Sequence, residues 1–262
     1  MEEKDVLHIT GTNKTYTANL VFDSRIPTEF FNTEDPYTRL LQHFRGWVVR
    51  TPEDRFDPDN FTMMDFRLQW PGTTSFTYVL PFTKREALIE FTLFTPSLLQ
   101  QDDYEKMLRR YCQEILAIHD FDILEIEQGV IPMSDFPFNR YSTDRQLKIG
   151  TAGGWVKPSS GYSFKNCEKN AQQIVDNLKQ GRPVGHGLHR SRFRWYDSIF
   201  LNVLNRRNDL GPGIFSDMYF KNDIQKIFAF LDEESSILDD IKMFQKFPKR
   251  LFLKSLLHHI SR

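Results

Sequence analysis

The spacing of apolar residues changes once along this 262-residue chain, near residue 150, and the change limits the folds open to it. Before that point, short β-rich runs alternate with Pro or Gly, which predicts strands of an antiparallel sheet. The first two strands should form a hairpin, and only residues 102–119 have helical spacing. The expected strands are residues 6–10, 15–22, 40–50, 63–70, 74–80, 87–95, 121–131 and 146–149.

Beyond residue 150, apolar residues recur three and four positions apart, which predicts helices. The expected helices are residues 159–179, 190–205, 215–231, 236–244 and 249–260. A chain of this length forms one large or two small domains. The pattern as a whole predicts an α+β fold whose last third is helical.

Charge and cysteine content exclude several function classes. The net charge is -1, so we expect no nucleic-acid partner. Two cysteines, Cys112 and Cys167, cannot form a disulfide framework or a cysteine-rich metal site. The histidines at 186, 189, 258 and 259 lack metal-ligand spacing, so no metal is expected. No apolar run reaches the roughly 18 residues of a spanning helix.

A glycine-rich turn is the first candidate for a binding site. Gly150, Thr151, Ala152, Gly153 and Gly154 follow the short strand 146–149 and precede a helix. Glycines let backbone N–H groups approach an anion, and a helix start adds its positive dipole end. Lys157 would add a charge, with Ser160 and Gly161 at the expected helix start. The alternative is a plain tight connection, and the fingerprint of three spaced glycines found in dinucleotide-binding folds is absent from the chain.

Asp23 and Arg25 stand at the end of an apolar strand. The carboxyl ends of strands are where open α/β sheets bind ligands, which makes these two residues candidates for the same crevice. A solvated loop with a local ion pair is the alternative interpretation.

Three carboxylates within apolar strands are candidates for acid chemistry. Alternation along residues 87–94 places Leu88, Glu90 and Thr92 on one face of the strand. A carboxyl buried among apolar side chains has a raised pKa and can donate a proton near neutral pH. Asp65 and Glu127 have similar surroundings, and all three side chains would face one cavity or, alternatively, solvent.

In sequence and order, these segments resemble the lycopene cyclase family of flavoproteins, in its bacterial β-cyclase branch. No single motif carries the resemblance. The order and spacing of the matching segments along the chain carry it. The matching stretches include residues 22–25, 42–47, 64–66, 78–82, 87–92, 127–133, 150–162 and 230–234.

The resemblance implies cyclisation of the linear ends of lycopene into β-rings, without net redox change, supported by reduced FAD with NAD(P)H as reductant. Glu90 falls on the first Glu of the family's catalytic motif, and Phe91 replaces the second Glu. Asp65 and Glu127 would stabilise the cation or act as the final base. Residues 150–154 fall on a flavin contact.

The resemblance further implies a flavoprotein-like fold of the glutathione-reductase type with an inserted antiparallel substrate sheet. Residues 1–35 would be the remnant of a dinucleotide-binding domain, residues 36–149 the substrate-binding sheet, and residues 150–262 the return to the flavin domain and the terminal helices. The family's amino-terminal glycine turn is not found in this chain, which is therefore expected to be an amino-truncated member.

Two other functions remain open: another FAD-dependent enzyme acting on an isoprenoid, and a non-catalytic remnant. Because lycopene is insoluble in water, we expect peripheral association with the cytoplasmic side of a membrane. Residues 244–262 contain five Lys or Arg and no acidic residue. Leu253, Leu256, Leu257 and Ile260 share a helical stripe suited to a lipid surface or, alternatively, to the protein core.

Overall fold

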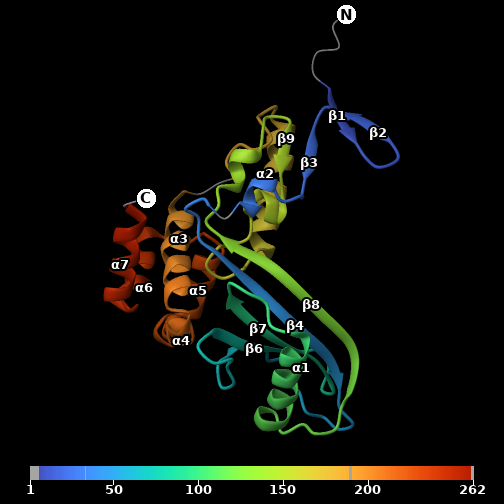
Figure 1. Ribbon diagram of the computed structural model, residues 1–262, viewed down its shortest axis with the longest axis vertical. Helices are drawn as coiled ribbons and strands as arrows, with labels where there is room; N and C mark the ends of the chain where they lie inside the picture. The colour runs from blue at the N-terminus through green and yellow to red at the C-terminus, as the bar shows by residue number, and fades with distance from the viewer. Residues whose placement is uncertain (1–5, 33, 189–190, 261–262) are drawn as a thin grey trace, which may run out of the picture.

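The computed structural model describes residues 6–32, 34–188 and 191–260, with the side chains of Ser191 and of residues 257–260 outside the description. Three regions are visible in Figure 1: a long twisted sheet, a group of helices beside its upper half, and a smaller region near the amino terminus. None of the helices in the described ranges has both the length and the apolar character needed to cross a bilayer.

The long sheet has five antiparallel strands, which confirms the sheet predicted for the first half of the chain. In spatial order they are β5 (Thr62–Asp65), β6 (Thr74–Pro81), β7 (Glu86–Thr95), β4 (Arg39–Arg50) and β8 (Asp122–Ser134). β4 is therefore an inner strand that pairs with β7 on one side and with β8 on the other.

Each face of this sheet packs against different helices. Alternate residues of β4, β6 and β7, including Trp47, Val79 and Phe91, pack against α1 (Gln101–Arg110) and the π-helical turn Tyr111–Ile115 that follows it. The opposite face carries Leu40, Phe76 and Phe94. That second face packs partly against the carboxyl-terminal helices, as Figure 1 shows for α3, α4 and α5.

The carboxyl-terminal part is helical, as expected. Its helices are α2 (Phe164–Lys179), α3 (Ser191–Arg206), α4 (Gly211–Lys221), α5 (Ile224–Leu231), α6 (Ile237–Phe244) and α7 (Lys249–Ile260). The single helix expected over residues 215–231 is two helices, α4 and α5. The break occurs where Asn222 adopts an extended conformation and the Asp223 side chain accepts a hydrogen bond from Gln225 N at 2.9 Å, which caps α5.

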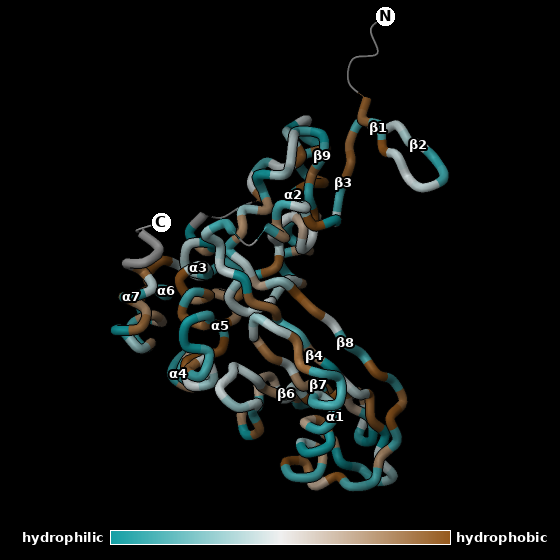
Figure 2. The backbone as a smooth tube through the Cα atoms, in the orientation of Figure 1, coloured by the Kyte–Doolittle hydropathy of each residue, from teal (hydrophilic) through white to brown (hydrophobic). Residues whose placement is uncertain are grey.

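Further segments differ from expectation. The helix expected over residues 159–179 begins at Phe164, so Ser160 and Gly161 lie in the loop before it and not at its start. The hairpin forms from β1 (Leu7–Thr10) and β2 (Thr15–Ala18), but residues 21–23 form a separate strand, β3 (Val21–Asp23). β3 pairs in parallel with β9 (Gln146–Lys148), away from the large sheet. β8 continues through Pro132, which an edge strand tolerates because one side of its ladder is free. Figure 2 shows apolar residues along this edge, where Ile126 and Val130 are exposed.

Candidate functional site

The glycine-rich turn follows β9 as a short 3-10 segment, Gly150–Gly153. Gly150 and Gly154 have φ angles of +58° and +70°, which residues other than glycine rarely adopt. Trp155 N donates to Gly150 O at 3.1 Å and closes the turn. Glycine is therefore needed here for the backbone path itself.

The turn and the end of β3 lie side by side, as the shared-crevice hypothesis requires. Ile149 N donates to Asp23 O at 3.0 Å, and Gly153 N donates to Ile149 O at 3.1 Å. A Cβ on Gly153 would collide with the carbonyl of Lys148. The structure thus brings the two candidate segments together without showing that either binds a cofactor.

The Asp23 carboxylate is already occupied by neighbouring side chains. Arg25 Nε donates to it at 2.9 Å and Lys148 Nζ at 2.9 Å. The hydrogen bonds from Arg25, followed by Lys148, hold the pKa of Asp23 well below its usual range although burial opposes them. Arg25, in turn, is largely exposed. This ion cluster is the local pair that the alternative interpretation described, and its residues are not part of the lining of the cavity beside the turn.

Lys157 does not supply a free charge to the turn. Its side chain is fully buried, and Nζ lies 3.0 Å from Asp197 Oδ2 and over the ring of Phe230. Ser159 Oγ donates to the other Asp197 oxygen at 2.5 Å. The sequence suggested an anion contact, but the structure shows a buried ion pair that joins the loop to α3.

The far end of the loop contacts the large sheet. Gly161 has a φ of +71°, and a Cβ there would overlap the side-chain amide of Gln42 on β4. Gln42 Oε1 and Ser160 Oγ are buried without a hydrogen-bond partner in the described part of the chain. Two unpaired buried acceptors beside a glycine backbone are suited to a ligand with hydrogen-bond donors.

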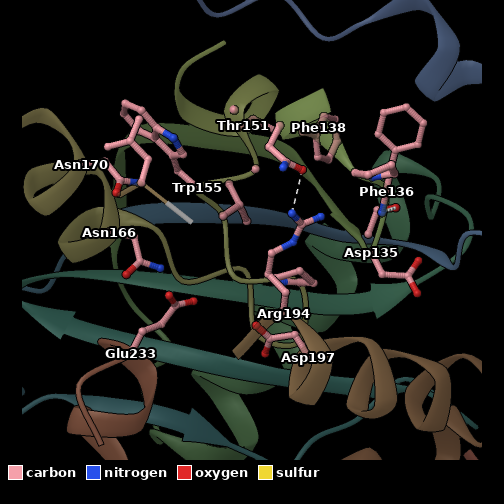
Figure 3. A pocket seen from close by; sticks show the side chains of 18 of the residues that line it. Asp135, Phe136, Phe138, Thr151, Trp155, Asn166, Asn170, Arg194, Asp197 and Glu233 are labelled. Carbon is pink, nitrogen blue, oxygen red and sulfur yellow. Dashed lines mark hydrogen bonds between the residues drawn. The ribbon is translucent and has the colours of Figure 1, made fainter. Parts of the chain in front are cut away.

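A cavity of about 1040 Å³ opens beside the glycine-rich turn. Thr151, Gly153, Gly154 and Trp155 line it from the turn, Asn166 and Asn170 from α2, and Arg194 and Asp197 from α3 (Figure 3). The half-buried Arg194 was not predicted, because nothing in its sequence context distinguishes it from a surface Arg. Its Nη1 donates to Asn139 Oδ1 at 2.7 Å, and burial lowers its pKa. The lining offers backbone, amide and guanidinium groups together with seven carboxylates, from Asp135, Glu168, Asp176, Asp197, Asp232, Glu233 and Glu234. It can therefore hold a large polar ligand, and the carboxylates favour ligand groups that donate hydrogen bonds.

Two of the three candidate carboxylates meet on the sheet face opposite α1. Gly46 on β4 pairs with Glu90 on β7 and with Glu127 on β8. The three residues therefore form one row across the sheet, and the side chain of Glu127 lies over the glycine. The sequence offered a signal for Gly46, since glycine inside a strand often marks a close approach.

The protonation of Glu90 is strongly perturbed. Burial, then the hydrogen bond and charge of Glu127, raise the pKa of Glu90 to about 8. The Thr92 hydroxyl donates to Glu90 Oε1 at 2.7 Å and opposes this effect. The raised pKa favours the protonated form of Glu90 at neutral pH, which agrees with the first of the two interpretations of its sequence context and not with a solvent-exposed carboxylate.

Aromatic and apolar side chains surround this acid. Tyr78 on β6 pairs with Glu90 across the ladder, and burial raises the pKa of the Tyr78 hydroxyl far above its usual range. A small cavity of about 40 Å³ lies next to Tyr78. Its lining is Met63, Met64, Tyr78, Phe94, Ser160, Tyr162, Phe215, Met218, Tyr219 and Leu231. Ser160 and Tyr162 connect this cavity to the end of the glycine-rich loop.

Asp65 does not join the other two carboxylates. It pairs with Thr77 and points to the α1 side of the sheet, where Tyr111 Oη donates to it at 2.7 Å. Arg67 Nε also donates to it, at 2.8 Å. The strand expected over residues 63–70 ends at Asp65, and its pairing with β6 is irregular between Thr62 and Asp65. The hypothesis that all three carboxylates face one cavity is wrong for Asp65.

The basic carboxyl-terminal segment lies partly within the described residues. α7 packs against the core through Leu251 and Phe252, while Leu253 is 56% exposed. Lys249, Arg250 and Lys254 are also exposed. Of the expected apolar stripe, the side chains of Leu257 and Ile260 lie outside the described residues, as does Arg262.

Comparison with solved structures shows the fold. A geranylgeranyl bacteriochlorophyll reductase-like protein from Thermoplasma acidophilum is similar with a TM-score of 0.51 at 10% identity, covering 96% of this chain and 67% of that one. A single-residue variant of HpxO from Klebsiella pneumoniae, complexed with FAD, is similar with a TM-score of 0.50 at 18% identity, covering 95% and 67%. Both likenesses confirm the flavoprotein-like α+β fold, and the chain spans about two thirds of each.

Comparison with curated proteins finds no match. The model of one family, described as lycopene cyclase protein, matches residues 1–257, which is nearly the whole chain. The same residues contain the glycine-rich turn and Glu90, to which the sequence resemblance had pointed, and Gly46, which it had not singled out. The chain belongs to the lycopene cyclase protein family.

Proposed function

We propose that this protein is a lycopene β-cyclase, an isomerase that closes the linear ends of lycopene into the β-rings of γ-carotene and β-carotene. The observation that carries the proposal is Glu90, a carboxyl of raised pKa that lies in one row with Glu127 on the sheet face opposite α1. Membership of the family supports the substrate class.

Cyclisation needs a neutral acid and a surface without water. Glu90 would protonate a terminal double bond of the polyene, and ring closure would leave a tertiary carbocation. Water would quench this cation. Tyr78, which pairs with Glu90, and the Met, Phe and Tyr side chains around the small cavity beside Tyr78 would exclude it. Ring faces and the nearby carboxylate would also stabilise the positive charge.

The cofactor of the proposed reaction is FAD. The glycine-rich turn, Arg194 and the large cavity would hold its polar part, and the unpaired Ser160 Oγ and Gln42 Oε1 would meet its ring end. When bound and reduced, FAD supplies an electron-rich ring that favours a nearby cation, and NAD(P)H is the proposed reductant. HpxO, which has a similar fold, is complexed with FAD, and this supports the assignment.

We also propose that the protein associates peripherally with the cytoplasmic side of a membrane, because lycopene dissolves in lipid and not in water. The exposed cations Lys249, Arg250 and Lys254, together with exposed Leu253, support α7 as the contact.

The test is expression of the full chain in lycopene-accumulating cells. The carotenoids are separated by chromatography, and their molecular masses are measured by mass spectrometry. Wild type should yield β-ring products of unchanged mass, and Glu90→Gln should reduce their formation by about 10²–10⁴-fold. The matched control is Glu86→Gln, which changes a Glu on the same strand that bonds Arg50 instead.

Other outcomes would replace the proposal. A product heavier by two hydrogens would make the protein an isoprenoid reductase. No product and no flavin absorbance in the purified chain would favour the non-catalytic alternative. Full ring formation by Glu90→Gln would move the acid to another residue.

A further inference from the structure

Gly46 lies at the centre of the row in which the two acidic side chains face each other across β4. Residues two strands apart in a sheet lie about 10 Å from each other, which is normally too far for direct side-chain contact. A Cβ on Gly46 would lie 2.9 Å from Glu127 Cγ and 3.0 Å from Glu127 Oε1. Leu88 Cδ1 would also lie 2.9 Å from this Cβ, so the side chains of Glu127 and Leu88 together occupy the space that any other residue at position 46 would fill.

The two carboxyls lie close enough for the hydrogen bonding and charge of Glu127 to raise the pKa of Glu90. Two ionised carboxylates repel each other and can only accept hydrogen bonds, so their proximity favours a proton on one of the two groups. Besides Glu127, the groups that act on Glu90 are the Thr92 hydroxyl on its own strand and Tyr78 on β6, and none of these is a cation.

We infer that Gly46 is a positioning residue: because it has no side chain, Glu127 lies over β4 against Glu90, and the two carboxyls hold one proton between them as a pair. This assignment deepens the proposed function, since it gives Glu127 a role in the same reaction.

In that reaction, which rests on the proposed function, the pair returns to its starting state. The Glu90 O–H bond breaks as a C–H bond forms at the terminal double bond, which leaves two carboxylates facing the cation. After the ring C–C bond forms, a ring C–H bond breaks and its proton returns to the pair. No electron is gained or lost, so the pair serves as the acid and then as the base.

The pair can be tested without substrate or cofactor, by following the carbonyl stretch of protonated carboxyls in the infrared as pH rises. In the full wild-type chain, a band that is absent in Glu90→Gln should titrate at about pH 8. In Glu127→Gln, which removes the neighbouring charge, the midpoint should fall by about 1–3 pH units. The control Glu125→Gln, on the exposed part of the same strand, should leave it unchanged.

Gly46→Ala tests the role of the glycine directly. The new Cβ should displace Glu127 and lower the midpoint in the same direction as Glu127→Gln. Gly213→Ala is the control, because a Cβ at Gly213 meets no atom within 4 Å. If Gly46→Ala does not fold, Glu127→Gln still decides whether the pair exists. The role of the glycine is then decided by adding Glu127→Ala to Gly46→Ala, which removes the Glu127 atoms that the new Cβ would meet and should restore folding; no recovery would refute the role.

Two results would overturn the claim that the two carboxyls hold one proton between them. One is an unchanged titration midpoint of the infrared band in Glu127→Gln, and the other is the absence of a band that titrates near pH 8 in wild type. Neither result depends on product formation. A failure of the cyclisation assay would thus refute the proposed substrate while leaving the pair intact, and the reverse combination would refute the pair alone.

Discussion

Gly161 lies directly against the side-chain amide of Gln42, and this contact joins the glycine-rich loop to the sheet face that carries the carboxyl pair. Gln42 and Gly46 are four residues apart on β4 and so share a face. At about 3.3 Å per residue, the loop contact and the carboxyl row are about 13 Å apart. A ligand held by the loop can thus reach the neighbourhood of the acid.

Gly161→Ala should destabilise the protein and weaken flavin retention, because it combines backbone strain with overlap of Gln42. Gly72→Ala is the matched control: Gly72 has a φ of +73° but no atom within 4 Å of a new Cβ, so only the strain of about 1–2 kcal/mol applies. Urea denaturation of both variants measures the difference. Adding Gln42→Ala to Gly161→Ala should recover the steric part, and equal losses in the two single variants would show that the contact is unimportant.

Lys157→Met should lower the free energy of unfolding by about 3–5 kcal/mol, since it leaves the buried Asp197 carboxylate without its partner. Lys165→Met is the control, because it breaks an exposed pair with Glu168 that contributes about 0.3–0.5 kcal/mol. Thermal and urea unfolding of the two variants give the comparison. A loss no larger than that of the control would mean that water reaches the Lys157 site.

The stability of wild type should fall with rising pH in the range set by Glu90. Its pKa is about 8 in the folded protein against 4.5 as its ordinary value, so the folded state binds the proton more tightly. The contribution is complete below about pH 4.5 and is lost as pH rises through 8, with about 1.4 kcal/mol for each pH unit between the two values.

Glu90→Gln has no proton to lose, so its stability relative to wild type should be higher at pH 9 than at pH 5. Unfolding curves of both proteins at the two pH values measure this difference. Glu86→Gln should show no comparable gain, and a pH-independent difference for Glu90→Gln would place the raised pKa elsewhere.

Changing Lys249, Arg250 and Lys254 together to Glu should abolish flotation with liposomes that contain anionic lipid, because these side chains are exposed on α7. A triple change of Lys14, Lys84 and Lys106 to Glu alters the net charge equally at distant positions and should float like wild type. If both triple variants float, or if wild type does not, α7 is not the membrane contact.

The periodicity of the sequence was enough to predict the sheet and the faces of β7, because alternation along a strand depends only on local geometry. It also placed Glu90 and Asp23 near their observed surroundings. The pairing of Glu90 with Glu127 could not be derived, because it depends on strand order, and β7 and β8 contact β4 from opposite sides.

The errors have similar causes. Lys157 was expected to face a ligand, but Asp197, forty positions further on, binds it in the core. Asp65 lies where β5 ends, and its orientation is set by Tyr111 beyond α1. Both outcomes depend on tertiary partners that spacing does not reveal. The break between α4 and α5 was visible in principle, since Asn222 and Asp223 are typical of a helix end followed by a cap.

The position of Gln42 and Gly46 on a single strand has a consequence for sequence variation. Substitutions between them change side chains but keep both residues on the same face. An insertion or deletion of one residue there would turn one of the two to the opposite face, against α1, and separate the loop contact from the carboxyl row. The segment 42–46 should therefore accept exchanges of Phe44 while rejecting any change of length, a pattern that a deep mutational library containing both kinds of variant would display.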